Sequence, residues 1–200
     1  MGERQATIHR RTAETEVWVT LNLDGQGRHE VATGVAFFDH MLAAWARHGL
    51  FDLQARVRGD LEVDSHHTVE DAGLALGEAL AAALGDKAGI ARFGEAVVPM
   101  DEALVLAAVD VSGRPHLAWE VPALTAPGAR LGTFDVELAR EFFAALASTG
   151  RLTLHVRQLA GGNLHHLAEA CFKAVGVALS RAVRLEPRRA GQIPSTKEVL

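Results

Sequence analysis

Hydrophobic and polar residues alternate along several short stretches of the chain, while in longer stretches the hydrophobic residues recur three or four positions apart. The first pattern is typical of a strand with one buried face, and the second of an amphipathic helix. In the first half of the chain these patterns predict a strand, a second strand, a helix, a third strand and a second helix. The stretches are 14–25, 27–34, 37–49, 50–63 and 66–86.

The second half of the chain repeats this order of elements. Its stretches are 102–113, 114–122, 135–150, 151–161 and 165–183. When Gly49 is aligned with Gly150, the histidine pair at 66–67 falls opposite the pair at 165–166 after a two-residue difference in the preceding turn. A repeat of this length changes the expected fold. It predicts an α+β protein of two duplicated halves, each a small sheet with helices on one side.

Composition and charge narrow the class of protein. The chain has 200 residues, a net charge of −5 and 48% hydrophobic residues, which are ordinary values for a globular domain. Its basic residues are scattered and its hydrophobic runs are short, so we expect neither a nucleic-acid partner nor a membrane role. The N-terminal residues are too polar for a signal peptide, and the single cysteine, Cys171, cannot form an intrachain disulfide. We therefore expect a cytoplasmic protein.

Two adjacent histidines stand at the start of each matched helix, with a glutamate one turn further on. On a helix, residues four apart share a face, whereas neighbours differ by about 100° around the axis. His66 and Glu70 can therefore hold one metal ion together while His67 points elsewhere, and the second helix repeats this arrangement. The candidate ligands on the two helices are His66, His67, Glu70, His165, His166 and Glu169.

The helix before each histidine pair offers one more donor, because His40 aligns with Glu141. Eight donors would give each of two metal ions four protein ligands. Imidazole and carboxylate suit zinc, manganese, iron or nickel, and the absence of cysteine ligands argues against a structural zinc site. A single copy of the pattern could be a solvated helix start at which the glutamate complements the helix dipole. Two copies in register favour metal binding.

Several motifs resemble those of the imidazoleglycerol-phosphate dehydratase family of histidine biosynthesis. They are FFDHML, DSHHTVEDAGLALGEAL, RFG, VPMDEAL, SGRP, GNLHHLAEACFKA and PSTK, and the resemblance runs from about residue 10 to the C-terminus. It implies a single domain over 1–200, with repeats at about 10–87 and 88–186 and a tail at 187–200. It also implies duplicated βα half-domains of the ribosomal protein S5 domain 2-like kind, each a four-stranded sheet with helices on one face.

The resemblance further implies a reaction and its requirements. Members of the family remove water from D-erythro-imidazole-glycerol phosphate to give imidazole-acetol phosphate. They use Mn²⁺, two ions per active site, and assemble into a large homo-oligomer of twenty-four chains with active sites between subunits. The expected partners of this chain are therefore a small phosphorylated imidazole substrate and other copies of itself.

Site residues carry over from the matching motifs. Glu14 in RTAET occupies the position of a family glutamate that would move the proton from carbon, although by itself it would pass for an exposed strand residue. Asp101 in VPMDEAL matches a second family position. The expected phosphate ligands are Arg92, Arg114, Lys173, Ser195 and Lys197. The polar tail that holds Ser195 and Lys197 is a candidate lid.

Two residues depart from the family pattern. Many relatives carry histidine where this chain has Glu141, and glycine is usual where it has Glu198. The main alternative function is a dinuclear metallohydrolase acting on a small phosphorylated substrate, which would also use histidine and carboxylate ligands. A shell that only stores metal is a third possibility, and it would need neither Glu14 nor the lysine of the tail.

Overall fold

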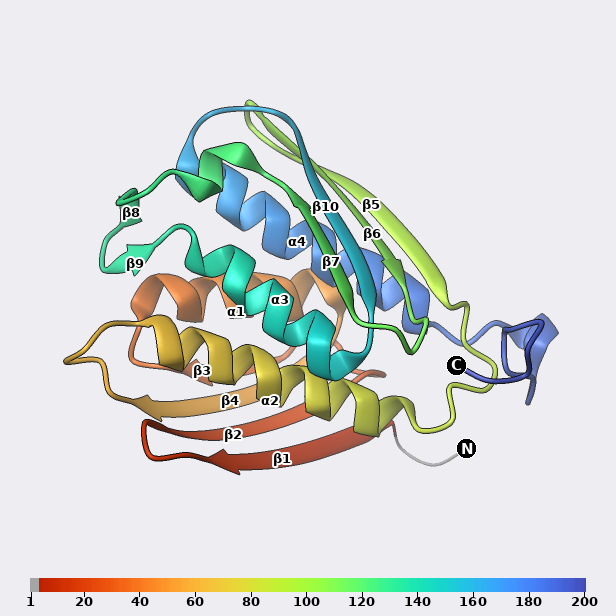
Figure 1. The fold of residues 1–200 in the computed structure, drawn as a ribbon. Coiled ribbons are helices and arrows are strands. Elements are labelled where there is room, and N and C mark those ends of the chain that lie inside the picture. The colour runs from red at the N-terminus through yellow and green to blue at the C-terminus, as the bar shows by residue number, and fades with distance from the viewer. Residues whose placement is uncertain (1–3) are drawn as a thin grey trace.

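Two four-stranded sheets enclose the helices in the computed structural model, which describes residues 4–200 (Figure 1). The first sheet has the spatial order β1 (Gln5–Arg11), β2 (Thr15–Asn22), β4 (Asp52–Gly59) and β3 (His29–Ala32). The second has the order β5 (Phe93–Met100), β6 (Ala103–Asp110), β10 (Thr153–Ala160) and β7 (His116–Glu120). The helices between them are α1 (Ala36–Gly49), α2 (His66–Leu84), α3 (Leu138–Gly150) and α4 (Leu164–Val183).

Strand pairing follows the same plan in both sheets. β1 and β5 run antiparallel to β2 and β6, which in turn run antiparallel to β4 and β10. The edge strands β3 and β7 are parallel to β4 and β10. The predicted fold class, two duplicated βα half-domains each with a four-stranded sheet, is therefore confirmed.

Side chains from both halves meet in one core between the helices. Phe142 of α3 lies with its ring centroid 5.3 Å from that of Phe38 in α1 and 5.2 Å from that of Phe172 in α4. All three side chains are fully buried. α2 packs along α3 and α1 packs along α4, so the helices of each half are covered by those of the other. Burial of this shared apolar surface stabilises the two halves as a unit.

Matched glycines allow the helices of the two halves to approach closely. A Cβ atom on Gly176 of α4 would lie 2.5 Å from the carbonyl oxygen of Trp45 in α1, and one on Gly77 of α2 would lie 2.7 Å from the amide nitrogen of Gly150 in α3. α1 continues through Gly49, and the left-handed cap conformation falls on Leu50, with φ of 59°. The helix thus ends at Gly49, and a Cβ atom on this glycine would lie 2.9 Å from the carbonyl oxygen of Gly176, so Gly49 also serves the close contact with α4.

The alternation of hydrophobic and polar residues predicts three strands in each half, whereas each sheet has four. The strands that it missed are the edge strands β1 and β5. β1 alternates only between exposed and half-buried residues. The first buried positions of β5 are Gly94 and Ala96, and a Cβ atom on Gly94 would lie 2.0 Å from the carbonyl oxygen of Ala178 in α4. Edge position and close helix contact therefore remove the large apolar residues by which strands are recognised.

The C-terminal tail folds back onto the segment that precedes β5. The amide nitrogen of Gly89 donates to the carbonyl oxygen of Gln192 over 2.8 Å, and Nη1 of Arg92 donates to the carbonyl oxygen of Pro194 over 2.8 Å. Long-range contacts thus order a segment that has no strong local signal. The remaining elements are the hairpin strands β8 (Arg130–Leu131) and β9 (Phe134–Asp135) and the 3-10 turns η1 (Pro122–Thr125) and η2 (Pro187–Arg189). Within residues 4–200, none of the helices is both long and apolar enough to cross a membrane.

Candidate metal and phosphate sites

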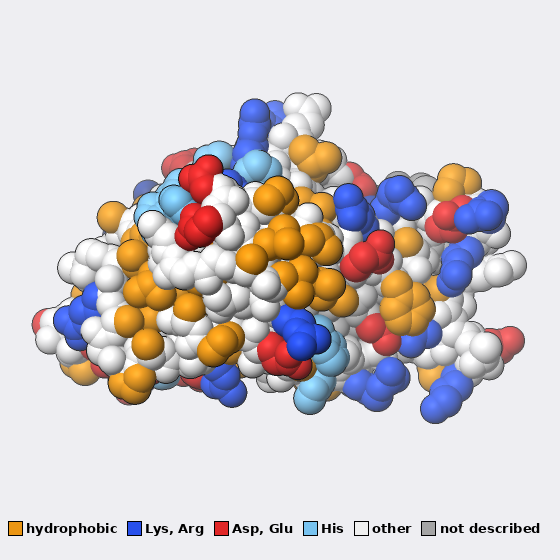
Figure 2. All heavy atoms as spheres, turned by 90° about the horizontal axis from the view of Figure 1, so that it is seen from above, with side chains coloured by type: hydrophobic (Ala, Val, Ile, Leu, Met, Phe, Trp, Pro, Cys, Tyr) orange, Lys and Arg blue, Asp and Glu red, His pale blue; other side chains and the backbone are white. Residues whose placement is uncertain are grey.

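Both histidine pairs lie at one end of the molecule, where the long helices begin (left in Figure 1). Asp64 fixes the start of α2, because its Oδ1 accepts a hydrogen bond from the backbone nitrogen of His66 over 2.7 Å. Asn163 fixes the start of α4 in the same way, accepting from the backbone nitrogen of His165 over 2.9 Å. Figure 2 shows histidine and acidic side chains gathered toward this end of the surface. Asn163 is the N-cap residue of α4, whereas Asp64 directly precedes Ser65, the N-cap residue of α2; in both helices the histidine pair lies in the first turn.

One potential metal cluster joins the two halves. Nε2 of His40, in α1, lies 3.1 Å from Oε2 of Glu169 in α4, and Nε2 of His165 lies 3.2 Å from the same oxygen. The ligand atoms of these three residues all lie within 4.8 Å of one another. Lys173, one turn further along α4, places Nζ 2.6 Å from Oε1 of Glu169.

The environment of Glu169 keeps its carboxyl group ionised. Burial is the largest influence and would raise the pKa of this carboxyl group, but hydrogen bonds from Lys173 and His40 outweigh it and lower the pKa. A carboxylate rather than a carboxylic acid is the form that binds a metal ion. The cluster therefore offers two imidazole nitrogens and a charged oxygen at one point.

The second histidine of each pair is held by an acidic residue outside the predicted set. Nδ1 of His67 lies 3.0 Å from Oδ2 of Asp60, and Nδ1 of His166 lies 2.8 Å from Oε2 of Glu102. These hydrogen bonds raise the pKa of both histidines. The hydrogen bond with His166 also lowers the pKa of Glu102 to about 2. Sequence reasoning missed both carboxylates; their only signal was acidic character in the turns near the histidine motifs.

The two predicted catalytic carboxylates lie in matching hairpin turns. Oε2 of Glu14, between β1 and β2, is 3.8 Å from Nδ1 of His67, and the Glu14 side chain is 55% exposed. Oδ2 of Asp101, between β5 and β6, is 3.6 Å from Nε2 of His166, and the Asp101 side chain is 78% exposed. The hydroxyl of Thr12 fixes the first turn by accepting from the backbone nitrogen of Glu14 over 3.1 Å.

The other predicted ligands do not form a second cluster. Over residues 4–200, His40, His165 and Glu169 are the one group of three whose ligand atoms converge. Oε1 of Glu141 instead lies 2.6 Å from Nη1 of Arg140. His66 and Glu70 share the first turns of α2, and α3, which carries Glu141, packs along this helix. The structure thus places these three on facing helices without bringing their ligand atoms together.

Four of the five predicted phosphate ligands lie at or beside the tail. Arg92 donates from Nε to Oδ1 of Asp110 over 2.8 Å, and Nη2 of Arg114 lies 3.8 Å from the other oxygen of Asp110. The backbone nitrogen of Lys197 donates to Oγ of Ser195 over 3.1 Å. A pocket opens between Arg92 and the tail, and its lining includes Phe93, Arg189, Gln192, Ile193, Pro194, Ser195 and Thr196.

The metal and phosphate sets lie at opposite ends of one strand. Arg92 directly precedes β5 and Asp101 directly follows it. Eight residues of strand at ~3.3 Å each span about 26 Å. Lys173 belongs with the metal set, since it contacts Glu169. Within one chain the two sets therefore cannot reach the same small molecule.

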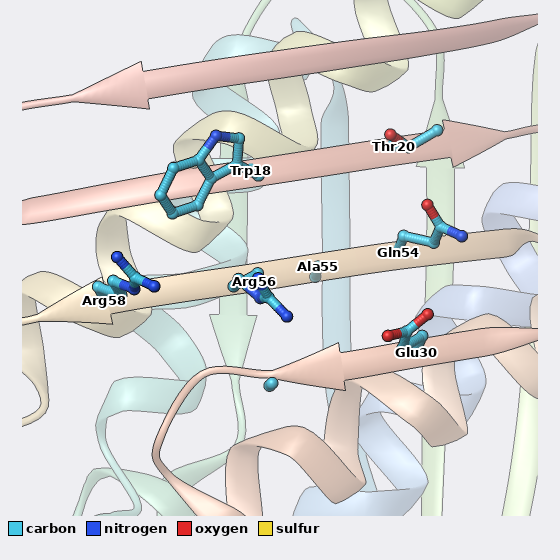
Figure 3. Close-up of a pocket in the computed structure, with 8 residues that line it drawn as sticks. Trp18, Thr20, Glu30, Gln54, Ala55, Arg56 and Arg58 are labelled. Carbon is cyan, nitrogen blue, oxygen red and sulfur yellow. The ribbon is translucent and has the colours of Figure 1, made fainter.

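A separate hollow on the outer face of the first sheet contains no predicted site residue (Figure 3). Trp18, Arg56 and Arg58 are prominent in its lining. The guanidinium carbon of Arg58 lies 5.8 Å from the centre of the Trp18 ring, and His9 stacks on that ring with centroids 4.9 Å apart. The hollow is therefore a feature of the sheet surface, distinct from the histidine cluster.

The two half-domains share one fold, and each places histidine and carboxylate side chains at the same end of the molecule. The protein therefore belongs to the class of duplicated α+β proteins and has a candidate metal site. A family model described as imidazoleglycerol-phosphate dehydratase matches residues 33–179. A protein of that name from Dinoroseobacter shibae is 58% identical over 194 residues, covering 97% of this chain and 98% of the relative. One from Moorella thermoacetica is 57% identical over 197 residues, covering 98% of each chain.

Solved structures give the same result. The Staphylococcus aureus imidazoleglycerol-phosphate dehydratase has a TM-score of 0.80 at 35% identity, covering 91% of this chain and 99% of that one. The Pyrococcus furiosus enzyme, in complex with (S)-C348, has a TM-score of 0.82 at 38% identity, covering 96% of this chain and 100% of that one. The chain therefore belongs to the imidazoleglycerol-phosphate dehydratase family, as its motifs suggested. It is a hydro-lyase of histidine biosynthesis.

Proposed function

We propose that this chain is a metal-dependent dehydratase that converts D-erythro-imidazole-glycerol phosphate to imidazole-acetol phosphate and water. The observation that carries the metal dependence is the convergence of His40, His165 and Glu169 from two halves of the chain within 4.8 Å. Family membership supports the dehydration itself.

The donor set fits Mn²⁺. Two imidazoles and an ionised carboxylate suit manganese, iron or zinc, and the one cysteine, Cys171, is buried and free in the core. Resemblance to the family favours manganese, two ions per active site, with His66, His67, Glu70, Glu141 and His166 as the other ligands. When bound, the metal would act as a Lewis acid that stabilises negative charge developing on the imidazole of the substrate. We also propose a cytoplasmic location, since a chain with one cysteine has no intrachain disulfide of the kind common in secreted proteins.

Glu14 is our candidate for the group that moves the proton. The C–H bond to be broken is not acidic, so a carboxylate must lie within hydrogen-bond reach of it. The exposure of Glu14 beside His67 supports this role, because a substrate bound at the histidines would lie near its carboxylate. Asp101, exposed beside His166, is the second candidate.

The phosphate of the substrate would be bound by Arg92, Arg114, Ser195 and Lys197. Lys173 would contact it from the end of the molecule where the metal ligands lie. Guanidinium groups suit the fork geometry of a phosphate, and the hydroxyl and ammonium add single contacts. The pocket between Arg92 and the tail supports this assignment.

We also propose that the active site forms between copies of the chain. A separation of about 26 Å along β5 exceeds the length of a glycerol phosphate that carries one imidazole ring. If the tail end of one copy faces the histidine end of another, both sets can contact one substrate. A homo-oligomer of twenty-four chains, implied by the family resemblance, would provide such contacts.

The test is direct. Protein stripped of metal with a chelator is incubated with the substrate, with and without added Mn²⁺, and imidazole-acetol phosphate is measured. We expect product only with metal. Release of inorganic phosphate would favour the metallohydrolase alternative, and absence of any turnover despite tight Mn²⁺ binding would favour metal storage. His165→Ala, which removes a ligand of the cluster, should lose Mn²⁺ together with activity.

A further inference from the structure

The first hairpin turn of each half faces the second histidine of that half. In the second sheet, Met100 pairs with Ala103, so the turn consists of Asp101 and Glu102. In the first sheet the corresponding turn contains Glu14. The repeat thus puts an acidic residue opposite each of these histidines, but the two residues are used differently.

In the second half the turn residue itself holds the histidine. Oε2 of Glu102 lies 2.8 Å from Nδ1 of His166, and its Oε1 accepts a hydrogen bond from the backbone nitrogen of Asn163 over 3.0 Å. Both oxygens of Glu102 are therefore committed to the start of α4.

In the first half the histidine is held by Asp60, which lies outside the hairpin turn. Nδ1 of His67 lies 3.0 Å from Oδ2 of Asp60, which follows β4, whereas Oε2 of Glu14 is 3.8 Å away. The position after β10 that corresponds to Asp60 is occupied by Gly161, so the second half has no counterpart. Asp60 is an addition to the first half only.

The imidazole of histidine has two nitrogens with linked roles. When Nδ1–H donates to a carboxylate, Nε2 carries the lone pair and can bind a metal ion, and the ring is held in one orientation. Loss of such an orienting carboxylate typically weakens metal binding by about 10–100-fold.

We propose that Asp60 and Glu102 are positioning residues that hold Nδ1 of His67 and His166 and so direct Nε2 of each ring toward a metal ion. Because Asp60 performs this task in the first half, Glu14 is released from it and is free to carry a proton. The two halves are therefore asymmetric: the turn carboxylate of the first half is exposed and lies 3.8 Å from its histidine, and that of the second half is an orienting group bonded to its histidine. This inference rests on the proposed metal-binding role of the histidines.

Mn²⁺ binding, measured in the absence of substrate, tests the positioning roles of Asp60 and Glu102. Metal-free protein is titrated with Mn²⁺, and free Mn²⁺ is followed by electron paramagnetic resonance. We expect Asp60→Ala and Glu102→Ala each to weaken binding by about 10–100-fold, while Glu14→Gln binds Mn²⁺ as tightly as the wild type. Asp60→Asn, which keeps the size and an acceptor oxygen, should recover part of the affinity. Glu62→Gln, at an exposed position of the same loop, is the matched control and should bind as the wild type does.

A double variant tests the release of Glu14. Without Asp60, Glu14 is the nearest carboxylate that can take over Nδ1 of His67, so Asp60→Ala combined with Glu14→Gln should bind Mn²⁺ more weakly than Asp60→Ala alone. Wild-type affinity in both alanine variants would overturn the inference. So would a loss in Glu14→Gln alone as large as that in Asp60→Ala, because Glu14 would then be the orienting group. A wild-type protein that binds no Mn²⁺ would refute the metal-dependent function and the inference with it.

Discussion

Two residues expected at the site have left-handed backbones, and so does one residue of the tail. Arg92, Asp101 and Glu198 have φ of 76°, 49° and 59°. Such conformations in residues other than glycine cost about 1–3 kcal/mol each and gather at functional sites. Glycine adopts the positive φ of Glu198 without strain, which agrees with the glycine that the family resemblance implies at this position. Leu50, Lys87 and Arg151 adopt the same conformation away from the predicted site, so Arg92 and Asp101, at the two ends of β5, are two of the six such residues in the described part of the chain.

Glu14→Gln should lower turnover by about 10²–10⁴-fold while Mn²⁺ and substrate still bind. Glutamine keeps the size of the side chain and its hydrogen bonding, but it cannot accept a proton. Steady-state kinetics with a parallel Mn²⁺ titration would check this. Wild-type turnover in the variant would remove Glu14 from the mechanism and make Asp101 the next carboxylate to test.

At the element scale, helix contacts between the halves decide where the ligands lie. α1 and α4 cross at Gly49 and Gly176, and this contact brings His40 toward Glu169. The cluster therefore depends on two small residues remote from it. The tail is a second such element, since its hydrogen bond to Arg92 shapes the pocket in which we propose that phosphate binds.

Gly176→Ala should destabilise the fold by about 1–3 kcal/mol, because the added methyl group would force the helices apart. The clash is with backbone, at 2.5 Å from the carbonyl oxygen of Trp45, so no side chain can rotate to relieve it. Thermal unfolding would measure the loss. Gly162→Ala is the matched control, since nothing lies within 4 Å of a Cβ atom there. Equal melting temperatures for the two variants would contradict the close-contact argument.

Lys197→Ala should mainly raise KM for the substrate. A phosphate contact far from the breaking bonds acts first on binding, and turnover falls as well only if phosphate binding also closes the tail. Separate kcat and KM values for the variant would show which applies. An unchanged KM would exclude Lys197 as a phosphate ligand.

At the scale of the whole molecule, the two functional ends point in opposite directions. The metal set lies where the helices begin, and the arginines and the tail lie at the far end of the second sheet (Figure 1). Such an arrangement suits an assembly in which unlike ends meet, and a metal ion bound there would stabilise the assembled state.

Removal of metal with a chelator should therefore promote dissociation of the homo-oligomer, and added Mn²⁺ should restore the assembly. Light scattering of the same sample before and after each step would follow the mass. A chain that remains a monomer in excess Mn²⁺ would rule out active sites shared between copies.

The sequence by itself determined the duplication, the order of most elements and the family. It did so because the helical spacing of apolar residues and the repeated histidine pairs are local patterns that survive in a single chain. Tertiary structure alone decided the edge strands β1 and β5, whose hydrophobic signal is weak, and the pairing of His40 with Glu169 across the two halves. It also decided the contacts of Asp60 and Glu102 with their histidines. These depend on distances between segments remote in sequence, and no local pattern encodes such distances.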